Sequence, residues 1–354
     1  MTAAATREHL KPKKATMTQT ESPLVSVITP TFNHEHYIGP CIESVLQQSH
    51  QNWEQIIVDD GSTDATARVV ASYSDQRIRY LHQENQGIEA LPHTYNRALD
   101  LCRGDFIAIL EGDDLWPADK LTHLMPGFID NEVVLAYGLA GEVSLDGTWG
   151  GQLTRSTRQR RNLPLSLLSN SPVGSATLHI LSGNDLVPPS TAIIRRSALE
   201  KIGGFQYVPG LCVTDFPTFL RLTLEGTFHY SPKIMGFRRR HTGSVTLNNM
   251  GTILRVAHQH SMDFVRTHQP PLNESDSEAI TRGWRLIQST GAFTEGRFKL
   301  VQRQWKQARK CFVRSADPFQ PRILLASVLG WSSSWLHRDL EWAMRAAGRA
   351  VLSA

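Results

Sequence analysis

The chain has 354 residues, of which 40% are hydrophobic and 20% are charged. These fractions are typical of a globular protein with a sizeable core, and they exclude a disordered tail protein, a collagen-like repeat and a disulfide-stapled miniprotein. The net charge of +4 is too small over this length to indicate a nucleic-acid partner by itself. A typical domain size of roughly 150 residues predicts about two domains.

Four cysteines lie far apart in the sequence and form no Cys-x-x-Cys pair. They predict neither a zinc site nor a redox motif, and they fit a reducing compartment. No apolar run follows the lysines near the N-terminus, as a signal peptide requires, and residues 323–336 are too short and too polar to span a bilayer. We therefore expect a soluble protein of the cytoplasm.

Short apolar runs alternate with amphipathic stretches between residues 24 and 110, which is typical of a parallel sheet flanked by helices. The pattern predicts strands at 24–29, 54–58, 78–81 and 106–110, and helices at 37–48, 65–73 and 90–101. It then weakens and predicts helices at 117–129, 197–202 and 215–225, strands at 133–139 and 190–194, and loops over 146–189. Residues 1–22 are expected to be disordered, and the chain past residue 248 to be helical.

Acidic side chains follow two of the predicted strands. Residues 59–64 read DDGSTD after the second strand, and residues 111–114 read EGDD after the fourth. Carboxylates gathered at one edge of a sheet suit a hard divalent cation such as Mg²⁺ or Mn²⁺, which would neutralise a diphosphate. The chain has neither a G-x-G-x-x-G nor a P-loop motif, so a nicotinamide dinucleotide and a P-loop hydrolase are disfavoured.

Four segments carry a resemblance to a known family. They are VSVITPTFNHEHYIGPCIESVLQQSHQNWEQIIVDDGSTDAT, NQGIEALPHTYNRAL, GDFIAILEGDDLWPADKL and ALEKIGGF. In order and spacing they resemble the family 2 glycosyltransferases, over roughly residues 24–245 and weakly between 140 and 190. The resemblance implies an α/β GT-A fold, a Rossmann-like and mostly parallel sheet flanked by helices. It divides the chain into a GT-A domain at 23–248, with a nucleotide-binding half (23–140) and an acceptor half (141–248), and a helical C-terminal region at 249–354.

The resemblance also implies roles for the two turns that embrace the nucleoside. Pro30 and Phe32 would lie beside the base, with Asn33 in the same turn, and Asp60 would accept a hydrogen bond from the imide N–H of uracil or thymine. Alternatively, the residues after Asp60 merely cap the next helix. Asn85, Gly87 and Asn96 match the segment that closes over the nucleotide sugar, although structural hydrogen bonding would explain Asn96 equally well.

The segment 111–114 matches the acidic metal-binding motif of the family, with Glu111 in place of the usual Asp. By resemblance, Asp113 and Asp114 would bind Mn²⁺ or Mg²⁺, and Asp113 would also contact the nucleotide sugar. Asp215 matches the catalytic base, although Thr214 replaces the usual Glu, and an ordinary helix N-cap is the alternative. Arg240 and His241 resemble the segment beside the diphosphate, for which a solvated basic turn is the alternative.

The implied reaction is an inverting transfer of a sugar from a nucleotide-diphosphate sugar to a hydroxyl acceptor, a glycan or a lipid-linked glycan. Such an enzyme would serve polysaccharide or glycolipid biosynthesis and would not bind nucleic acid. A catalytically silent nucleotide-sugar-binding protein is the alternative. A nucleotidyltransferase is disfavoured because the turn at 30–34 has no glycine or lysine for a phosphate loop. The arginines at 155–161, with the apolar stretch 323–331, suggest a peripheral position on the inner membrane face, but a solvated loop and a buried helix would explain them too.

Overall fold

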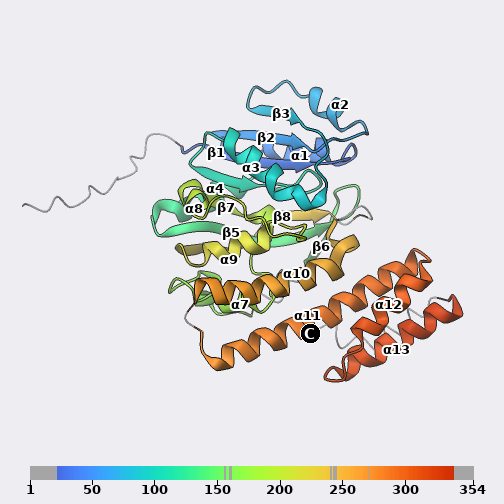
Figure 1. Cartoon of the computed structure of the whole chain (residues 1–354). Helices are drawn as coiled ribbons and strands as arrows, with labels where there is room; N and C mark the ends of the chain where they lie inside the picture. The colour runs from blue at the N-terminus through green and yellow to red at the C-terminus, as the bar shows by residue number, and fades with distance from the viewer. Residues whose placement is uncertain are drawn as a thin grey trace, which may run out of the picture.

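The computed structural model describes residues 22–154, 157–158, 162–239, 241, 245–270 and 272–338. Nearly all of the expected disordered tail lies outside these residues. An eight-stranded mixed sheet forms the centre, with the strand order β3-β2-β1-β4-β7-β5-β6 and β8 paired to β5 (Figure 1). All four cysteines are buried and have free thiols, so they form no disulfide; they are Cys41, Cys102, Cys212 and Cys311.

The first half of the sheet is the parallel unit that the sequence predicts. Its strands are β1 (Val25–Thr31), β2 (Trp53–Asp59), β3 (Ile78–His82) and β4 (Phe106–Ile109). The connecting helices are α1 (Ile38–Leu46), α2 (Thr66–Ala71) and α3 (Leu91–Leu101), the last preceded by a 3-10 turn at Ile88–Ala90. Parallel strands require such crossovers, so their carboxyl ends meet at one edge.

Alternate residues of the central strands enter two separate cores. Ile28 and Ile56 pack on one face with α3, whereas Val27 and Ile57 pack on the other with α1. Because successive side chains of a strand point to opposite faces, both faces must be covered, and β1, β2 and β4 are buried at every position. The sequence of β4, FIAI, is accordingly apolar at every position.

The second half of the sheet is mixed. Its strands are β5 (Val133–Val143), β6 (Trp149–Leu153), β7 (Ile193–Arg195) and β8 (Thr227–Arg239), in which β7 is antiparallel to β4 and β5, and β8 is parallel to β5. The helices around it are α4 (Lys120–Leu124), α6 (Leu165–Leu168), α7 (Thr177–Leu181), α8 (Arg196–Lys201) and α9 (Asp215–Leu222), with 3-10 turns at Met125–Ile129 and Pro189–Thr191.

Several expectations for this half were wrong. The helix expected at 117–129 is only α4 followed by a 3-10 turn that contains Pro126, because proline cannot donate the helical hydrogen bond. The strand expected at 190–194 is limited to β7. The stretch expected to be loops contains β6, α6 and α7, and β8 was not predicted at all.

The C-terminal region is helical, as expected. It consists of α10 (Val245–His268), α11 (Glu274–Val301), α12 (Trp305–Ser315) and α13 (Pro321–Leu336). The domain boundary expected between residues 248 and 249 falls inside α10, and Ile253 and Trp284 belong to the same core as the sheet. None of the helices within the described ranges has the length and apolar character needed to cross a bilayer.

Candidate active site

A cavity of about 640 Å³ lies at the carboxyl ends of β1, β2 and β4. This is where ligands bind in open α/β sheets. Its other walls include residues 183–190, the end of β8, the start of α9, the apolar side of α10 and Trp284 of α11. Of the residues singled out by the sequence, it is lined by Pro30, Phe32, Asp60, Asn85, Gly87, Asp113, Asp114, Asp215 and His241.

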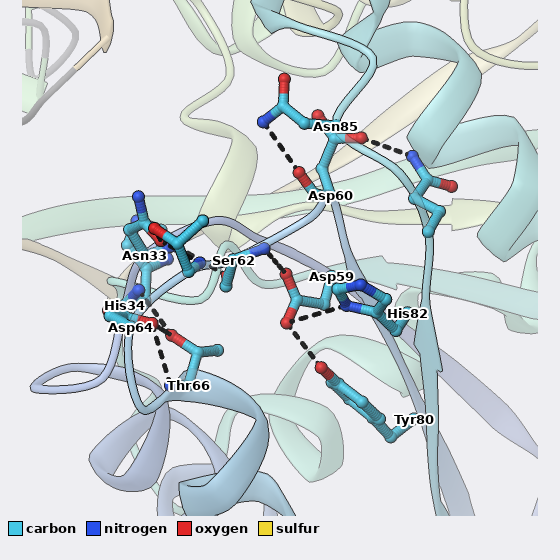
Figure 2. A network of polar contacts seen from close by, with 12 residues as sticks. Asn33, His34, Asp59, Asp60, Ser62, Asp64, Thr66, Tyr80, His82 and Asn85 are labelled. Carbon is cyan, nitrogen blue, oxygen red and sulfur yellow. Dashed lines mark hydrogen bonds and ion pairs between the residues drawn. The ribbon is translucent and has the colours of Figure 1, made fainter.

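The two turns that follow β1 and β2 are fastened to each other (Figure 2). Asn33 has a positive φ of 52°, its backbone N–H donates to Ser62 Oγ at 2.8 Å, and its Oδ1 accepts the N–H of Thr63 at 2.8 Å. Asp64 accepts the N–H groups of Glu35 and of Thr66, the first residue of α2. Asn33 is absent from the cavity lining, so it shapes the pair of turns and leaves the inner surface to Phe32 and Asp60.

Asp60 faces the cavity with one carboxylate oxygen already engaged. Its Oδ1 accepts Gln83 Nε2 at 2.6 Å and the N–H of Gln86 at 3.1 Å, while Oδ2 makes no hydrogen bond to another described residue. Asn85 donates to the backbone carbonyl of Asp60 (Figure 2). Its side-chain oxygen accepts the N–H of Gly87. Gly87 has φ +79°, a left-handed conformation that side chains rarely adopt, and this explains the glycine. The loop therefore holds Asp60 with Oδ2 available to a ligand.

Asp113 is paired with a histidine from the other end of the fold. His241 Nε2–H donates to Asp113 Oδ2 at 2.8 Å, and both side chains line the cavity. Burial tends to raise the pKa of Asp113, but the hydrogen bond from His241 and the nearby imidazole of His34 outweigh it and hold that pKa below its ordinary value. Asp113 is therefore the ionised carboxylate of the acidic motif.

Asp114 is directed to the backbone of β8. Its Oδ1 accepts the N–H of Arg239 at 3.1 Å, and the Arg239 guanidinium donates to the carbonyl of Asp113 at 3.0 Å. Burial, followed by the charge of Asp113, raises the pKa of Asp114 to about 7.

Arg239 is 3% exposed, and its Nη2 has no hydrogen-bond partner among the described residues. A buried, unsatisfied N–H is costly, and an anionic ligand would satisfy it.

Glu111, the departure from the usual motif, is held by an aromatic residue of α3. The hydroxyl of Tyr95 donates to Glu111 Oε1 at 3.1 Å. Burial and the neighbouring carboxylates raise the pKa of Glu111 well above its ordinary value, so this side chain is kept neutral. Its place beside the ionised Asp113 thus avoids a second buried negative charge.

Asp215 begins α9 and lines the same cavity. Burial, followed by the charge of Asp185, raises the pKa of Asp215 to about 6. The N-cap alternative for Asp215 was wrong, because Thr214 occupies the N-cap and Asp215 is the first residue of the helix. The first turn of α9 still supplies N–H groups to the Asp215 carboxylate, which is compatible with a role as base. A carboxyl group with a pKa near the working pH is suited to accept a proton.

Asn96, like Asn33, is absent from the described residues that line the cavity. Asn96 makes a reciprocal pair with the backbone of Phe205, in which Nδ2 donates to its carbonyl at 2.9 Å and Oδ1 accepts its N–H at 2.8 Å. These bonds fit the structural alternative, in which Asn96 holds the G-G-F turn against α3. Arg240 lies outside the described residues, whereas the adjacent Arg238 and Arg239 do line the cavity.

Sequence reasoning missed several lining residues, among them His34, Asp185, Arg238 and Arg239. His34 stands in the P-T-F-N-H turn and could have been chosen by proximity. Asp185 lies in the weakly matched stretch, and Arg239 is one of three consecutive arginines with no pattern to mark it as the buried one. They are identified as site residues only by the structure, which brings them to the same cavity.

The described side chains of this site could supply only part of the ligands that a divalent cation needs. Within the described part of the chain, no three His, Cys, Asp or Glu side chains are arranged to hold a metal ion. Mg²⁺ and Mn²⁺ are commonly held by one or two carboxylates together with substrate phosphates. The ionised Asp113 fits that donor set better than Asp114, whose oxygen is engaged by the backbone of β8.

Comparison with known proteins agrees with the fold. A family model described as glycosyl transferase family 2 matches residues 26–203. TuaG of Bacillus subtilis, a glycosyltransferase assigned to teichuronic acid biosynthesis, is 38% identical over 210 residues, which cover 59% of this chain and 75% of TuaG. The chain therefore belongs to glycosyl transferase family 2, and it is a glycosyltransferase.

Two further similarities bear on ligands and fold. WfgD of Escherichia coli is a UDP-Glc:alpha-D-GlcNAc-diphosphoundecaprenol beta-1,3-glucosyltransferase, and it is 40% identical to this chain over 115 residues. These residues make up 32% of this chain and 45% of WfgD, which is less than half of that relative. The mannosyltransferase PcManGT of Pyrobaculum calidifontis, solved with GDP-Man and Mn²⁺, superposes on this chain with a TM-score of 0.53 at 18% sequence identity. The superposition covers 90% of this chain and 89% of the PcManGT chain. The fold is thus GT-A, as expected from the sequence.

Proposed function

We propose that this glycosyltransferase transfers a sugar from a UDP- or dTDP-sugar, with inversion, to a hydroxyl group of a glycan or lipid-linked glycan in cell-envelope polysaccharide biosynthesis. The observation that carries the proposal is that one cavity holds both Asp113 and Asp215, an ionised carboxylate and a carboxyl group with a pKa of about 6. The relatives TuaG, of teichuronic acid biosynthesis, and WfgD support the polysaccharide context, and the diphosphoundecaprenol-linked acceptor of WfgD supports a lipid-linked acceptor.

The nucleoside would occupy the end of the cavity between Phe32 and Asp60. Phe32 is 44% exposed at the cavity wall and offers a flat apolar surface to a base. Asp60 Oδ2 would accept the imide N–H of uracil or thymine, which guanine and cytosine do not offer in the same position. This contact favours UDP or dTDP over GDP and CMP.

The diphosphate would lie between the acidic motif and β8. Asp113, with His241 beside it, would hold a divalent cation, which when bound neutralises charge on the diphosphate. Arg239 Nη2, the buried N–H without a partner, would donate to a phosphate oxygen, and Arg238 at the cavity wall adds a second positive charge. Both arginines then stabilise the negative charge that develops on the leaving group.

The chemical step needs a base and no protein nucleophile. Asp215 takes the proton of the acceptor hydroxyl while the hydroxyl oxygen forms its bond to the anomeric carbon. The bond from that carbon to the diphosphate breaks, and the electron pair leaves with the nucleoside diphosphate. Attack opposite the leaving group inverts the anomeric configuration.

The test is nucleotide binding followed by transfer. We expect thermal stabilisation by UDP or dTDP with Mn²⁺, weaker stabilisation by GDP and CMP, and loss of the effect in Asp113→Ala. Asp215→Asn should keep nucleotide binding and lose transfer, and the anomeric proton of the product, followed by NMR, should report inversion. Binding by the wild type without transfer to any glycan or lipid-linked acceptor would instead favour the catalytically silent protein.

A further inference from the structure

The last three helices form a small unit with its own core. The C-terminal half of α11 packs with α12 and α13 around Phe293, Leu300, Ala308, Phe312 and Ala326. Figure 1 shows α12 and α13 (orange to red) on the outer end of α11, apart from the central sheet. Their outer faces are therefore not needed to cover the catalytic domain.

One face of α13 is apolar although it is exposed. Leu325, Val328, Trp331 and Trp335 follow one another at intervals of three or four residues and are 42–59% exposed. This spacing places them along one side of the helix. The two tryptophan rings meet edge to face at 5.9 Å, and Leu336 beside them is 62% exposed. A contiguous exposed apolar face of this kind indicates an interaction surface.

The same unit carries an excess of positive charge. Residues 295–338 contain nine Lys and Arg against two acids, a net charge of +7, whereas the whole chain carries +4. The rest of the protein is therefore net negative. Of the two acids, Asp317 is 7% exposed and Glu295 is paired with Arg314 at 3.0 Å. The positive charge of this unit is consequently little neutralised from within.

Arg309 joins the charged and the aromatic parts into one surface. Its guanidinium lies 4.3 Å from the centre of the Trp335 ring, and its Nη1 donates to the carbonyl of Ser334. The same side chain lines an open groove between α11 and α12, together with Lys299, Lys310 and Arg314. The cationic groove between α11 and α12 is thus contiguous with the tryptophan-bearing face of α13.

We propose that this surface, made of α12, α13 and the last turns of α11, docks on a membrane that contains anionic phospholipid. α13 lies in the interface with its apolar face in the lipid, the tryptophans lie at the level of the headgroups, and the cationic groove binds lipid phosphate. Positive charge, exposed tryptophan and an amphipathic helix together match such a bilayer in both charge and polarity. The docking is peripheral.

The position of the surface suits the proposed acceptor, and this part of the inference rests on the proposed function. Trp284 of α11 lines the active-site cavity, and Lys299 lies fifteen residues further along the same helix, about 22 Å away. A sugar on a lipid carrier could therefore enter the cavity while the cationic groove binds lipid phosphate at the membrane surface. Of the arginines first considered for membrane contact, Arg155, Arg160 and Arg161 lie outside the described residues.

The experiment is co-sedimentation of the full chain with vesicles, without nucleotide or acceptor. We expect binding to phosphatidylcholine mixed with phosphatidylglycerol, at least tenfold weaker binding to phosphatidylcholine alone, and weakening by salt. The variants Trp331→Ser/Trp335→Ser and Lys299→Gln/Lys310→Gln should each lose tenfold or more. Ile129→Ser, at a residue 77% exposed on the catalytic domain, and Arg68→Gln/Lys233→Gln should bind as the wild type does.

Transfer to a soluble acceptor should be unchanged in the tryptophan variant, which separates membrane docking from catalysis. Failure of the wild type to bind anionic vesicles, or equal binding by wild type and both surface variants, would overturn the docking proposal and leave the proposed reaction standing. If the tryptophan variant instead converts a dimer to a monomer in sedimentation velocity, the face joins two copies of the chain and the membrane proposal is wrong.

Discussion

His241 Nε2 lies 2.8 Å from Asp113 Oδ2, although the two residues are 128 positions apart in the chain. The contact joins the segment after β8 to the acidic motif after β4 and fixes the orientation of the carboxylate whose pKa is lowered there. A partner that orients a metal-binding carboxylate contributes to metal affinity even without touching the ion.

We therefore expect His241→Ala to weaken Mn²⁺ binding in the presence of UDP by about tenfold or more. The measurement is Mn²⁺ titration monitored by thermal stabilisation or calorimetry. His36→Ala is the matched control, because its side chain is exposed and faces Glu35. Equal Mn²⁺ affinity in His241→Ala and wild type would show that Asp113 does not need this partner.

The pH dependence of transfer should follow Asp215. The base must be ionised, and its pKa is raised to about 6, so kcat/KM should fall as the pH drops below about 6. Asp185→Asn removes the negative charge that disfavours ionised Asp215 and should shift this acid limb to lower pH. The shift should be partial, because burial, the larger cause, remains. Asp146→Asn, on an exposed turn, is the control, and an unshifted limb in Asp185→Asn would contradict the coupling.

Phe32→Ala should weaken UDP binding by about tenfold. Stacking of a base on an aromatic side chain contributes roughly 1–3 kcal/mol, and Phe32 is the aromatic residue of the first turn that lines the cavity. The dissociation constant of UDP, measured by calorimetry, reports the change. Phe319→Ala is the control, because Phe319 is 75% exposed on the C-terminal unit. Should both variants bind UDP alike, the base does not lie on Phe32.

Asn96→Ala should affect stability, with donor affinity retained. The substitution leaves the N–H and carbonyl of Phe205 without their partner, which costs about 2 kcal/mol. Urea unfolding measures the loss, and UDP binding to the folded variant should match that of the wild type. Asn162→Ala, at an exposed position, should be nearly neutral. A large loss of UDP affinity without destabilisation would restore Asn96 as a ligand-binding residue.

The nucleotide-binding half could be predicted closely because it is built from local patterns. Apolar strands, amphipathic helices and turn residues each occupy a few consecutive positions, so the order of elements from residue 24 to residue 110 follows from the sequence. The acidic motif also lies within four residues. In contrast, β8 escaped prediction because its pairing with β5 is shifted at three places, and Pro232 and Gly236 interrupt the period-two alternation that marks a strand.

By itself, the sequence determined the class of fold, the family and the two acidic turns, since these depend on short-range order and on motifs with fixed spacing. The tertiary structure decided which of these side chains face the cavity. Asn33 and Asn96 are used for hydrogen bonds within the fold, whereas Arg239 and Asp185 enter the site from distant segments. Burial, the hydrogen bond from His241 that lowers the pKa of Asp113, and the charge of Asp185 that raises the pKa of Asp215 arise only when strands and helices far apart in the chain enclose one cavity.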